Sequence, residues 1–346
     1  MKKKILAMIL ACAMILALAA CSGSANTKQP AAENTASDAA EAPAASEETA
    51  ASAEGKTYTV GVCQLVQHEA LDAATQGFCD ALTEALGDAV SIDVQNASGD
   101  SVNCGTIVNG FVSKNVDLIM ANATPALTAA ASATADIPIL GTSITAYGVA
   151  LDIADFSGTV GGNISGTSDL ADLSAQAQMI LDWFPETQKV GLLFCSAEPN
   201  SRYQIEEVAK YLADKGVETE EFAFTDTNDV ASVTQSAADD SDVVYIPTDN
   251  TAAANTEAIG NVLIPAGIPA ICGEEGICRG CGVATLSISY YDLGVTTGKM
   301  AAKILTGEAN ISEMPVEFTD ATPKYNPSVC EQLGITPLEG YEAIEG

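Results

Sequence analysis

The chain has 346 residues, ten cysteines and a formal net charge of −32. A surface this acidic repels nucleic acid and anionic lipid head groups, so nucleic-acid binding is excluded. About 290 residues follow the polar N-terminal part, enough for one large or two medium domains with cores of their own.

Residues 1–21 have the composition of a secretory signal. Three lysines precede an apolar run that is too short for a membrane-spanning helix. The run ends in "LALAAC", which resembles the lipobox of bacterial lipoproteins and predicts lipidation of Cys21. An ordinary signal cut nearby, or a retained anchor, is the alternative. Residues 22–56 contain mostly Ala, Ser, Thr, Glu and Pro, and we expect them to form a disordered spacer on the extracytoplasmic face of the membrane.

From residue 58 onward, short Val/Ile-rich runs alternate with amphipathic helices. Strands are predicted at 58–65, 90–97, 116–123, 137–143, 161–168, 189–194, 243–250, 268–276 and 284–290. Between them the pattern predicts helices at 69–87, 101–115, 124–135, 169–184 and 202–212. This alternation indicates βαβ units and parallel sheets, an α/β fold.

Two stretches of the chain share one plan. Residues 116–143 and 241–275 each contain an aspartate-led strand, a Thr-bearing turn, an Ala-rich helix and an Ile-Pro strand. One half of the protein therefore resembles the other. Two similar doubly wound lobes would bind a ligand between the carboxyl ends of their strands.

The predicted strand ends carry polar side chains and no lysine or arginine. Hydroxyls and helix N-termini suit a carboxylate, whereas Asp249 and Glu274 suit an ammonium. We therefore expect a zwitterionic amino acid with an apolar or aromatic side chain, its ammonium on Asp249. The candidate ligand-binding residues are Gln67, His68, Thr124, Ser143, Ser196, Asn200, Ser201, Asp249, Asn250, Glu274 and Tyr290.

Each candidate also has a structural interpretation. In this interpretation Asn200, Asp249 and their neighbours cap helices without contacting a ligand, and Tyr290 belongs to the core. His68 is expected to cap or line the first helix start. No G-x-S-x-G elbow, P-loop or dinucleotide fingerprint is present, so neither an enzyme nor a cofactor is predicted.

The segment "CGEEGICRGC" contains Cys272, Cys278 and Cys281. The pattern leaves free thiols, a local disulfide or a metal site open. A zinc site would need a fourth ligand, and the only histidine is distant in sequence. We therefore predict no metal.

Seven motifs in order resemble one known family. They are "VGVCQLVQHEALDAATQGFCDALTE", "ANATPA", "GGNISGTSDL", "CSAEPNS", "YIPTDNT", "GEEG" and "SISYYDLGVTTGKMAAKIL". Together they resemble ABC-transporter substrate-binding lipoproteins of the type I periplasmic-binding fold, a subgroup with tryptophan-, tyrosine- and phenylalanine-binding members.

The resemblance implies two lobes joined by three crossovers that close on a ligand. Lobe 1 would comprise 57–168 and 285–314, and lobe 2 would comprise 169–284 and 315–346. It favours Thr124, Ser196, Asn200, Ser201, Asp249, Asn250 and Glu274 as cleft residues. It also implies a lipid-anchored monomer whose partners are a small-molecule ligand, an ABC permease and an ATPase.

Two departures concern specificity. Gln67 and Glu69 stand where relatives commonly have Glu and Pro, and an Asp-Pro pair near Tyr147 is missing. Four alternatives remain. The same fold could bind another solute such as a nucleoside or act as a sensory receptor, or the protein could be an extracytoplasmic hydrolase or a structural lipoprotein.

Overall fold

The computed structural model describes residues 56–345, so Cys21, the signal and residues 22–55 of the spacer lie outside the described residues. Two sheets organise this part of the chain. The first has the order β11-β5-β4-β3-β1-β2 and the second has the order β13-β12-β10-β9-β8-β6-β7. Pairing is parallel except between β10 and β12, which are antiparallel. The predicted α/β fold with two doubly wound lobes is confirmed.

Lobe 1 is built on the first sheet. Its strands are β1 (Tyr58–Gln64), β2 (Val90–Asn96), β3 (Leu118–Asn122), β4 (Ile139–Ile144), β5 (Ile164–Ser168) and β11 (Glu317–Phe318). Its helices are α1 (Glu69–Leu86), α2 (Ser101–Lys114), α3 (Thr124–Ala133), α4 (Tyr147–Ala150) and α11 (Tyr290–Thr306), with short 3-10 turns η1 (Gly87–Ala89) and η2 (Ile311–Glu313).

Lobe 2 is built on the second sheet. Its strands are β6 (Lys189–Cys195), β7 (Glu218–Phe224), β8 (Val243–Ile246), β9 (Ala270–Cys272), β10 (Ala284–Ile288), β12 (Ala321–Tyr325) and β13 (Glu342–Ala343). Its helices are α5 (Leu173–Trp183), α6 (Pro199–Asp214), α7 (Val230–Asp240), α8 (Asn250–Ala253), α9 (Thr256–Ala266), α10 (Glu275–Cys281) and α12 (Pro327–Leu333).

The two lobes have matching topology. The order β2-β1-β3-β4-β5 in the first sheet corresponds to β7-β6-β8-β9-β10 in the second. The repeated plan read from the sequence corresponds to β3-α3-β4 and to β8, α8, α9 and β9. The central strands are buried on both faces, as is usual for parallel sheets.

The chain crosses between the lobes after β5, β10 and β11. Because β10 pairs in the second sheet and β11 in the first, two of these changes follow residues 288 and 318. The sequence analysis placed them after 284 and 314. Each crossover therefore leaves directly from the carboxyl end of a strand.

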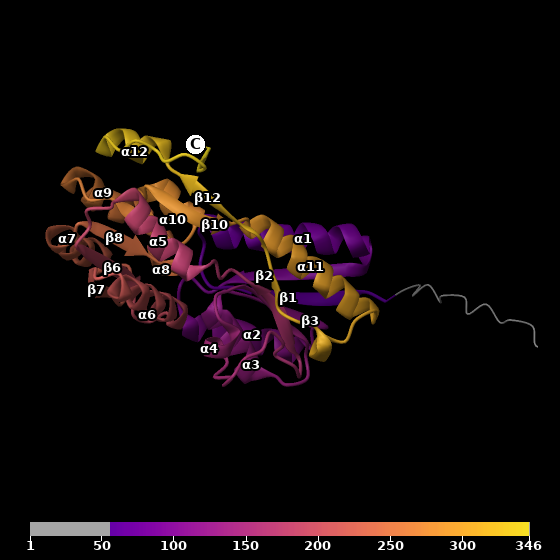
Figure 1. The fold of residues 1–346 in the computed structure, drawn as a ribbon. Coiled ribbons are helices and arrows are strands. Elements are labelled where there is room, and N and C mark those ends of the chain that lie inside the picture. Colours follow the sequence, from indigo (N-terminus) through magenta and orange to yellow (C-terminus); the bar gives the residue numbers. More distant parts are fainter. Residues whose placement is uncertain (1–55, 346) are drawn as a thin grey trace, which may run out of the picture. The chain divides into compact units, whose positions relative to one another are not determined.

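Helices α1 and α11 lie side by side and cover one face of the first sheet (Figure 1). Leu71, Ala74, Phe78 and Leu82 form the buried stripe of α1, whereas Ala85 is exposed. Within residues 56–345, no helix has both the length and the apolar character that crossing a bilayer requires.

Candidate functional site

The carboxyl ends of the strands in both sheets border a cleft between the lobes. Its inner part is a space of about 10 Å³. Lining residues from lobe 1, lobe 2 and the crossovers are His68, Leu71, Ser143, Thr145, Asp169, Asn200, Thr248, Asp249, Asn250, Ala253, Glu274 and Tyr290. Because this volume is about that of one water molecule, an amino acid could enter only when the lobes part.

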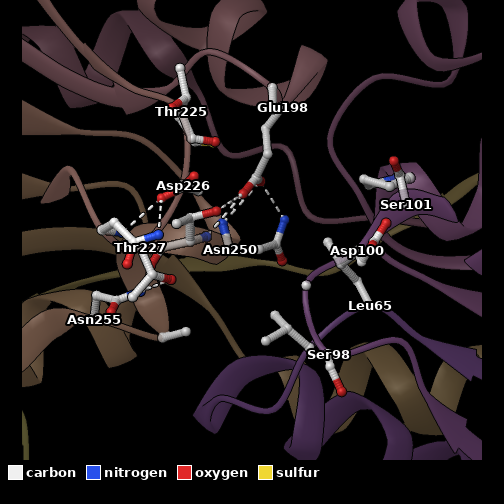
Figure 2. A pocket seen from close by; sticks show the side chains of 18 residues that line it. Leu65, Ser98, Asp100, Ser101, Glu198, Thr225, Asp226, Thr227, Asn250 and Asn255 are labelled. Atoms are coloured by element: carbon white, nitrogen blue, oxygen red, sulfur yellow. Dashed lines mark hydrogen bonds between the residues drawn. The ribbon is translucent and has the colours of Figure 1, made fainter. Parts of the chain in front are cut away.

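A larger outer cavity of about 380 Å³ adjoins the inner space at Asn250, which lines both. Figure 2 shows Leu65, Ser98 and Asp100 of lobe 1 on one wall and Glu198 with Asn250 of lobe 2 on another. Both polar and apolar side chains line this cavity.

Polar contacts across the cleft hold the lobes together. His68 Nε2 lies 3.2 Å from Asn250 Oδ1, and the hydroxyls of Thr145 and Thr248 are 3.4 Å apart. At the surface, Arg279 Nη2 lies 3.0 Å from a carboxylate oxygen of Glu69. The described conformation is therefore a closed one.

Three residues that line the inner space each have a buried polar atom without a hydrogen-bond partner among the described residues. These atoms are Ser143 Oγ, Asp169 Oδ1 and Asn200 Oδ1. Buried polar atoms are nearly always paired in native proteins, because each unpaired group costs about 1–3 kcal/mol. Their convergence on one space from both lobes indicates a binding site for a polar group.

Backbone conformation aims Ser143 into the cleft. Its φ is 56°, in the left-handed region that a non-glycine residue rarely adopts. The pairing of β4 with β5 shifts register between Gly141 and Ile144, on either side of this residue. Bulges and positive-φ residues of this kind cluster where a side chain is re-aimed at a functional site.

Asp249 acts as the N-cap of α8. One carboxylate oxygen accepts from Ala252 N at 2.8 Å, and the other accepts from Cys195 N at 2.6 Å and Ser201 Oγ at 2.7 Å. Burial and the neighbouring Glu198 raise the pKa of Asp249 to about 8, against the lowering effect of these donors. The structural alternative of a cap is thus observed, and both oxygens already have donors.

Glu274 has a similar arrangement at the start of α10. Its carboxylate accepts from Gly276 N at 2.6 Å and from Ile277 N at 2.5 Å. Burial raises its pKa to about 7, although these two backbone donors act in the opposite direction. Glu274 lines the inner space while serving as a cap.

Asp169 lies on the crossover that follows β5. One of its oxygens accepts at 2.9 Å from Oη of Tyr290, the first residue of α11 after the second crossover. Burial raises the pKa of Asp169 to about 6, while the hydroxyls of Tyr290 and Thr145 and the residue's own backbone N–H act to lower it. The group is therefore mainly ionised at neutral pH, and no ion pair within residues 56–345 involves it.

The structure brings together some of the other candidates and not all. His68, Asn200, Asn250 and Tyr290 line the inner space, and Gln67 lines a neighbouring surface pocket. His68 is the N-cap residue of α1 and makes no side-chain capping bond, so of the two roles expected from the sequence, capping or lining the helix start, the structure shows the second. Burial lowers its pKa, which keeps the imidazole neutral near pH 7.

Three further candidates do not line the described cavities. Ser196 is exposed, and its hydroxyl donates to Phe224 O. Ser201 is buried behind the cleft and supports Asp249. Thr124 starts α3 and is buried within lobe 1.

Sequence reasoning did not single out Glu198, which organises the lobe 2 side of the cleft. Its carboxylate accepts from Asn250 N and Nδ2 at 3.0 and 2.6 Å, and from Thr251 N and Oγ1 at 2.9 Å each (Figure 2). A fifth bond reaches it from Asn200 Nδ2 at 3.2 Å. Glu198 could have been identified from its place in the segment "SAEPNS", which follows a predicted strand.

The cysteines are free thiols throughout the described residues, Cys272, Cys278 and Cys281 included. These three are buried around β9 and α10. Within residues 56–345, no group of three or more His, Cys, Asp or Glu side chains could hold a metal ion.

A protein-family model described as "ABC transporter substrate binding protein" matches residues 59–341. A "Tyrosine-binding protein" of Clostridioides difficile is 33% identical over 270 residues, which cover 77% of this chain and 78% of that protein.

Two solved structures have similar folds and differ in state. A Streptococcus pneumoniae ABC domain in complex with L-Trp is 31% identical, with a TM-score of 0.79, over 84% of this chain and all of that one. A ligand-free, open substrate-binding protein with adhesive properties from Clostridium difficile is 32% identical, over 84% of this chain and 99% of that one. Its TM-score is 0.64. At nearly equal identity, the chain is thus more similar in fold to the ligand-bound structure than to the open one, in agreement with its closed cleft.

Proposed function

Because this chain belongs to the family of ABC transporter substrate-binding proteins, we propose that it binds an aromatic amino acid between its lobes. The observation that carries the proposal is the group of unpartnered polar atoms of Ser143, Asp169 and Asn200 around one buried space. The names of the tyrosine-binding relative and of the Trp complex support the aromatic class.

When the lobes are further apart than in the described conformation, the inner space would hold the charged ends of the ligand. The ligand side chain would extend into an adjoining cavity. The outer cavity offers apolar contacts from Leu65, Val66 and Pro125. Asp226 and Asn228, which also line it, could bond the hydroxyl of a tyrosine. The lobes would open to admit the ligand and close on it, since contacts to both lobes exist only in the closed state.

The protein would act outside the cytoplasm as a monomer that delivers its ligand to a permease and an ATPase. The anchor would be a lipid on Cys21, a proposal that rests on "LALAAC" and on the composition of residues 22–56. Substituting Cys21→Ala should release the protein from membrane fractions or block its processing. Normal cleavage with unchanged membrane retention would reject the anchor.

A thermal-shift screen of soluble residues 56–346 against the amino acids, nucleosides and common sugars tests the ligand class. A ligand at 100 times its Kd stabilises the folded state by about 2.7 kcal/mol, so a cognate ligand should raise Tm clearly. We expect tyrosine, tryptophan or phenylalanine to give the largest shift. A larger increase in Tm with a nucleoside would indicate that the protein binds this class of solute and not an aromatic amino acid.

The hydrolase alternative has little geometric support. His68 is the only histidine of the chain, and its Nε2 faces the amide oxygen of Asn250. No serine hydroxyl is hydrogen-bonded to it among the described residues. The arrangement thus favours binding over nucleophilic catalysis.

A further inference from the structure

Asp169 is a buried carboxylate that lacks a counter-ion. Its side chain belongs to a residue only 6% exposed, on the crossover between β5 and α5. Tyr290 Oη supplies one hydrogen bond, to Oδ2. Oδ1 is buried and has no partner among the described residues, and Asp169 is one of the residues that line the inner space. Burying a charge in this way is costly unless a cation compensates it.

The other buried carboxylates of the cleft differ in this respect. Asp249 has donors on both oxygens from the backbone of β6 and α8 and from Ser201. Glu274 is occupied by two backbone N–H groups of α10. Glu198 accepts from the backbone and side chains of Asn250 and Thr251. Asp169 alone among these four carries an oxygen with no donor.

Two further atoms complete the arrangement. Asn200 lines the inner space and donates through Nδ2 to Thr248 O at 3.0 Å, whereas its Oδ1 has no partner among the described residues. Ser143 presents its unpartnered Oγ from the bulge in β4. One carboxylate oxygen, one amide oxygen and one hydroxyl oxygen can together accept the three N–H bonds of a primary ammonium.

We propose that Asp169 binds the ammonium group of the ligand, with Asn200 and Ser143 as its neutral acceptors. The proposal rests on the proposed function and deepens it: the cleft selects ligands with a free primary amine. Tyr290 is a positioning residue that orients the carboxylate of Asp169. Asp249 remains a structural cap.

The location of these groups gives the ammonium a role in closure. Asp169 lies on the first crossover, Tyr290 at the start of α11 directly after the second crossover, Ser143 on lobe 1 and Asn200 on lobe 2. A cation bound among them contacts both lobes and the hinge at once. Burial is the main cause of the raised pKa of Asp169. A bound cation nearby would favour the ionised carboxylate and lower this pKa again.

The test is a calorimetric cycle in which the protein charge and the ligand amine are removed separately. L-Tyrosine is compared with 3-(4-hydroxyphenyl)propionic acid, which lacks only the amine, on the wild type and on Asp169→Asn. Corresponding pairs for phenylalanine and tryptophan are run alongside. Asp172→Asn on the same crossover is the matched control, because its exposed side chain only caps α5 and Asn caps equally well.

For the wild type we expect the amino acid to bind at least about 30-fold more tightly than its des-amino analogue. Asp169→Asn should weaken L-tyrosine by about tenfold to a hundredfold and change the analogue by less than about threefold. Asp172→Asn should match the wild type with both ligands. L-Tyrosinamide, which keeps the amine, should lose affinity in Asp169→Asn by a factor similar to that for L-tyrosine.

Several results would overturn the assignment. If Asp169→Asn lost affinity equally for the amino acid and its des-amino analogue, Asp169 would have a structural role only. If this variant kept the wild-type affinity for L-tyrosine, Asp169 would not bind the ammonium. If Asp169→Asn does not fold, the wild type alone decides, because equal binding of L-tyrosine and N-acetyl-L-tyrosine would reject amine recognition. A wild type that binds no aromatic amino acid would overturn the proposed function together with this assignment.

Discussion

Replacing Gly294 with alanine is expected to destabilise the protein by at least about 3 kcal/mol. A Cβ at this position of α11 would lie 2.0 Å from Ala74 O and 2.9 Å from Phe78 N in α1. Neither backbone atom can move without separating the two helices, since protein interiors are close-packed. Because α11 begins at Tyr290 and α1 follows His68, the same substitution should also weaken ligand binding.

The matched control is Gly105→Ala in α2, where a Cβ would meet nothing within 4 Å. Alanine is favoured over glycine inside a helix, so this variant should gain about 0.5–1 kcal/mol. Urea unfolding of both variants gives the two free energies of unfolding. A Gly294→Ala variant as stable as the wild type would show that α1 and α11 are not in contact as described.

Glu198→Ala is expected to lower the free energy of unfolding by about 3 kcal/mol and to weaken ligand binding more than tenfold. The substitution leaves four donors of Asn250 and Thr251 without their acceptor. Asn250 would then lose the orientation in which its Oδ1 faces His68 across the cleft. Binding should suffer because the closed state depends on this contact.

The control is Glu207→Ala in α6, the helix that Glu198 directly precedes. The carboxylate of Glu207 forms only an exposed ion pair with Lys210, so its loss should cost less than about 1 kcal/mol and leave affinity unchanged. Urea unfolding and calorimetry on both variants separate the two expectations. If Glu198→Ala and Glu207→Ala changed stability and affinity equally, Glu198 would not organise the cleft.

The sequence predicted the sheets well because hydrophobic periodicity is a local signal. Alternating strands and helices, and the repeated plan of residues 116–143 and 241–275, correspond to the two matching sheets. The partner of a strand is not a local property. The run at 284–290 reads as a strand in either lobe, so the crossovers after β10 and β11 were placed four residues early.

The position of Asp169 could not be recognised for a related reason. The predicted helix 169–184 included this residue in its first turn, whereas α5 begins at Leu173 with Asp172 as its N-cap. The segment "DLAD" offers two aspartates as caps, and the pattern does not distinguish them. Likewise, the contact of His68 with Asn250 joins residues 182 positions apart, which local patterns cannot reveal.

Calorimetric titration of ligand-free residues 56–346 with L-tyrosine, L-tryptophan and L-phenylalanine tests the central claim most directly. An amino acid enclosed between the two lobes should bind to one site per chain, with a negative heat-capacity change from the apolar surface that closure buries. Saturable binding of at least one of the three with this stoichiometry is the predicted result. No detectable binding of any of them would contradict the account.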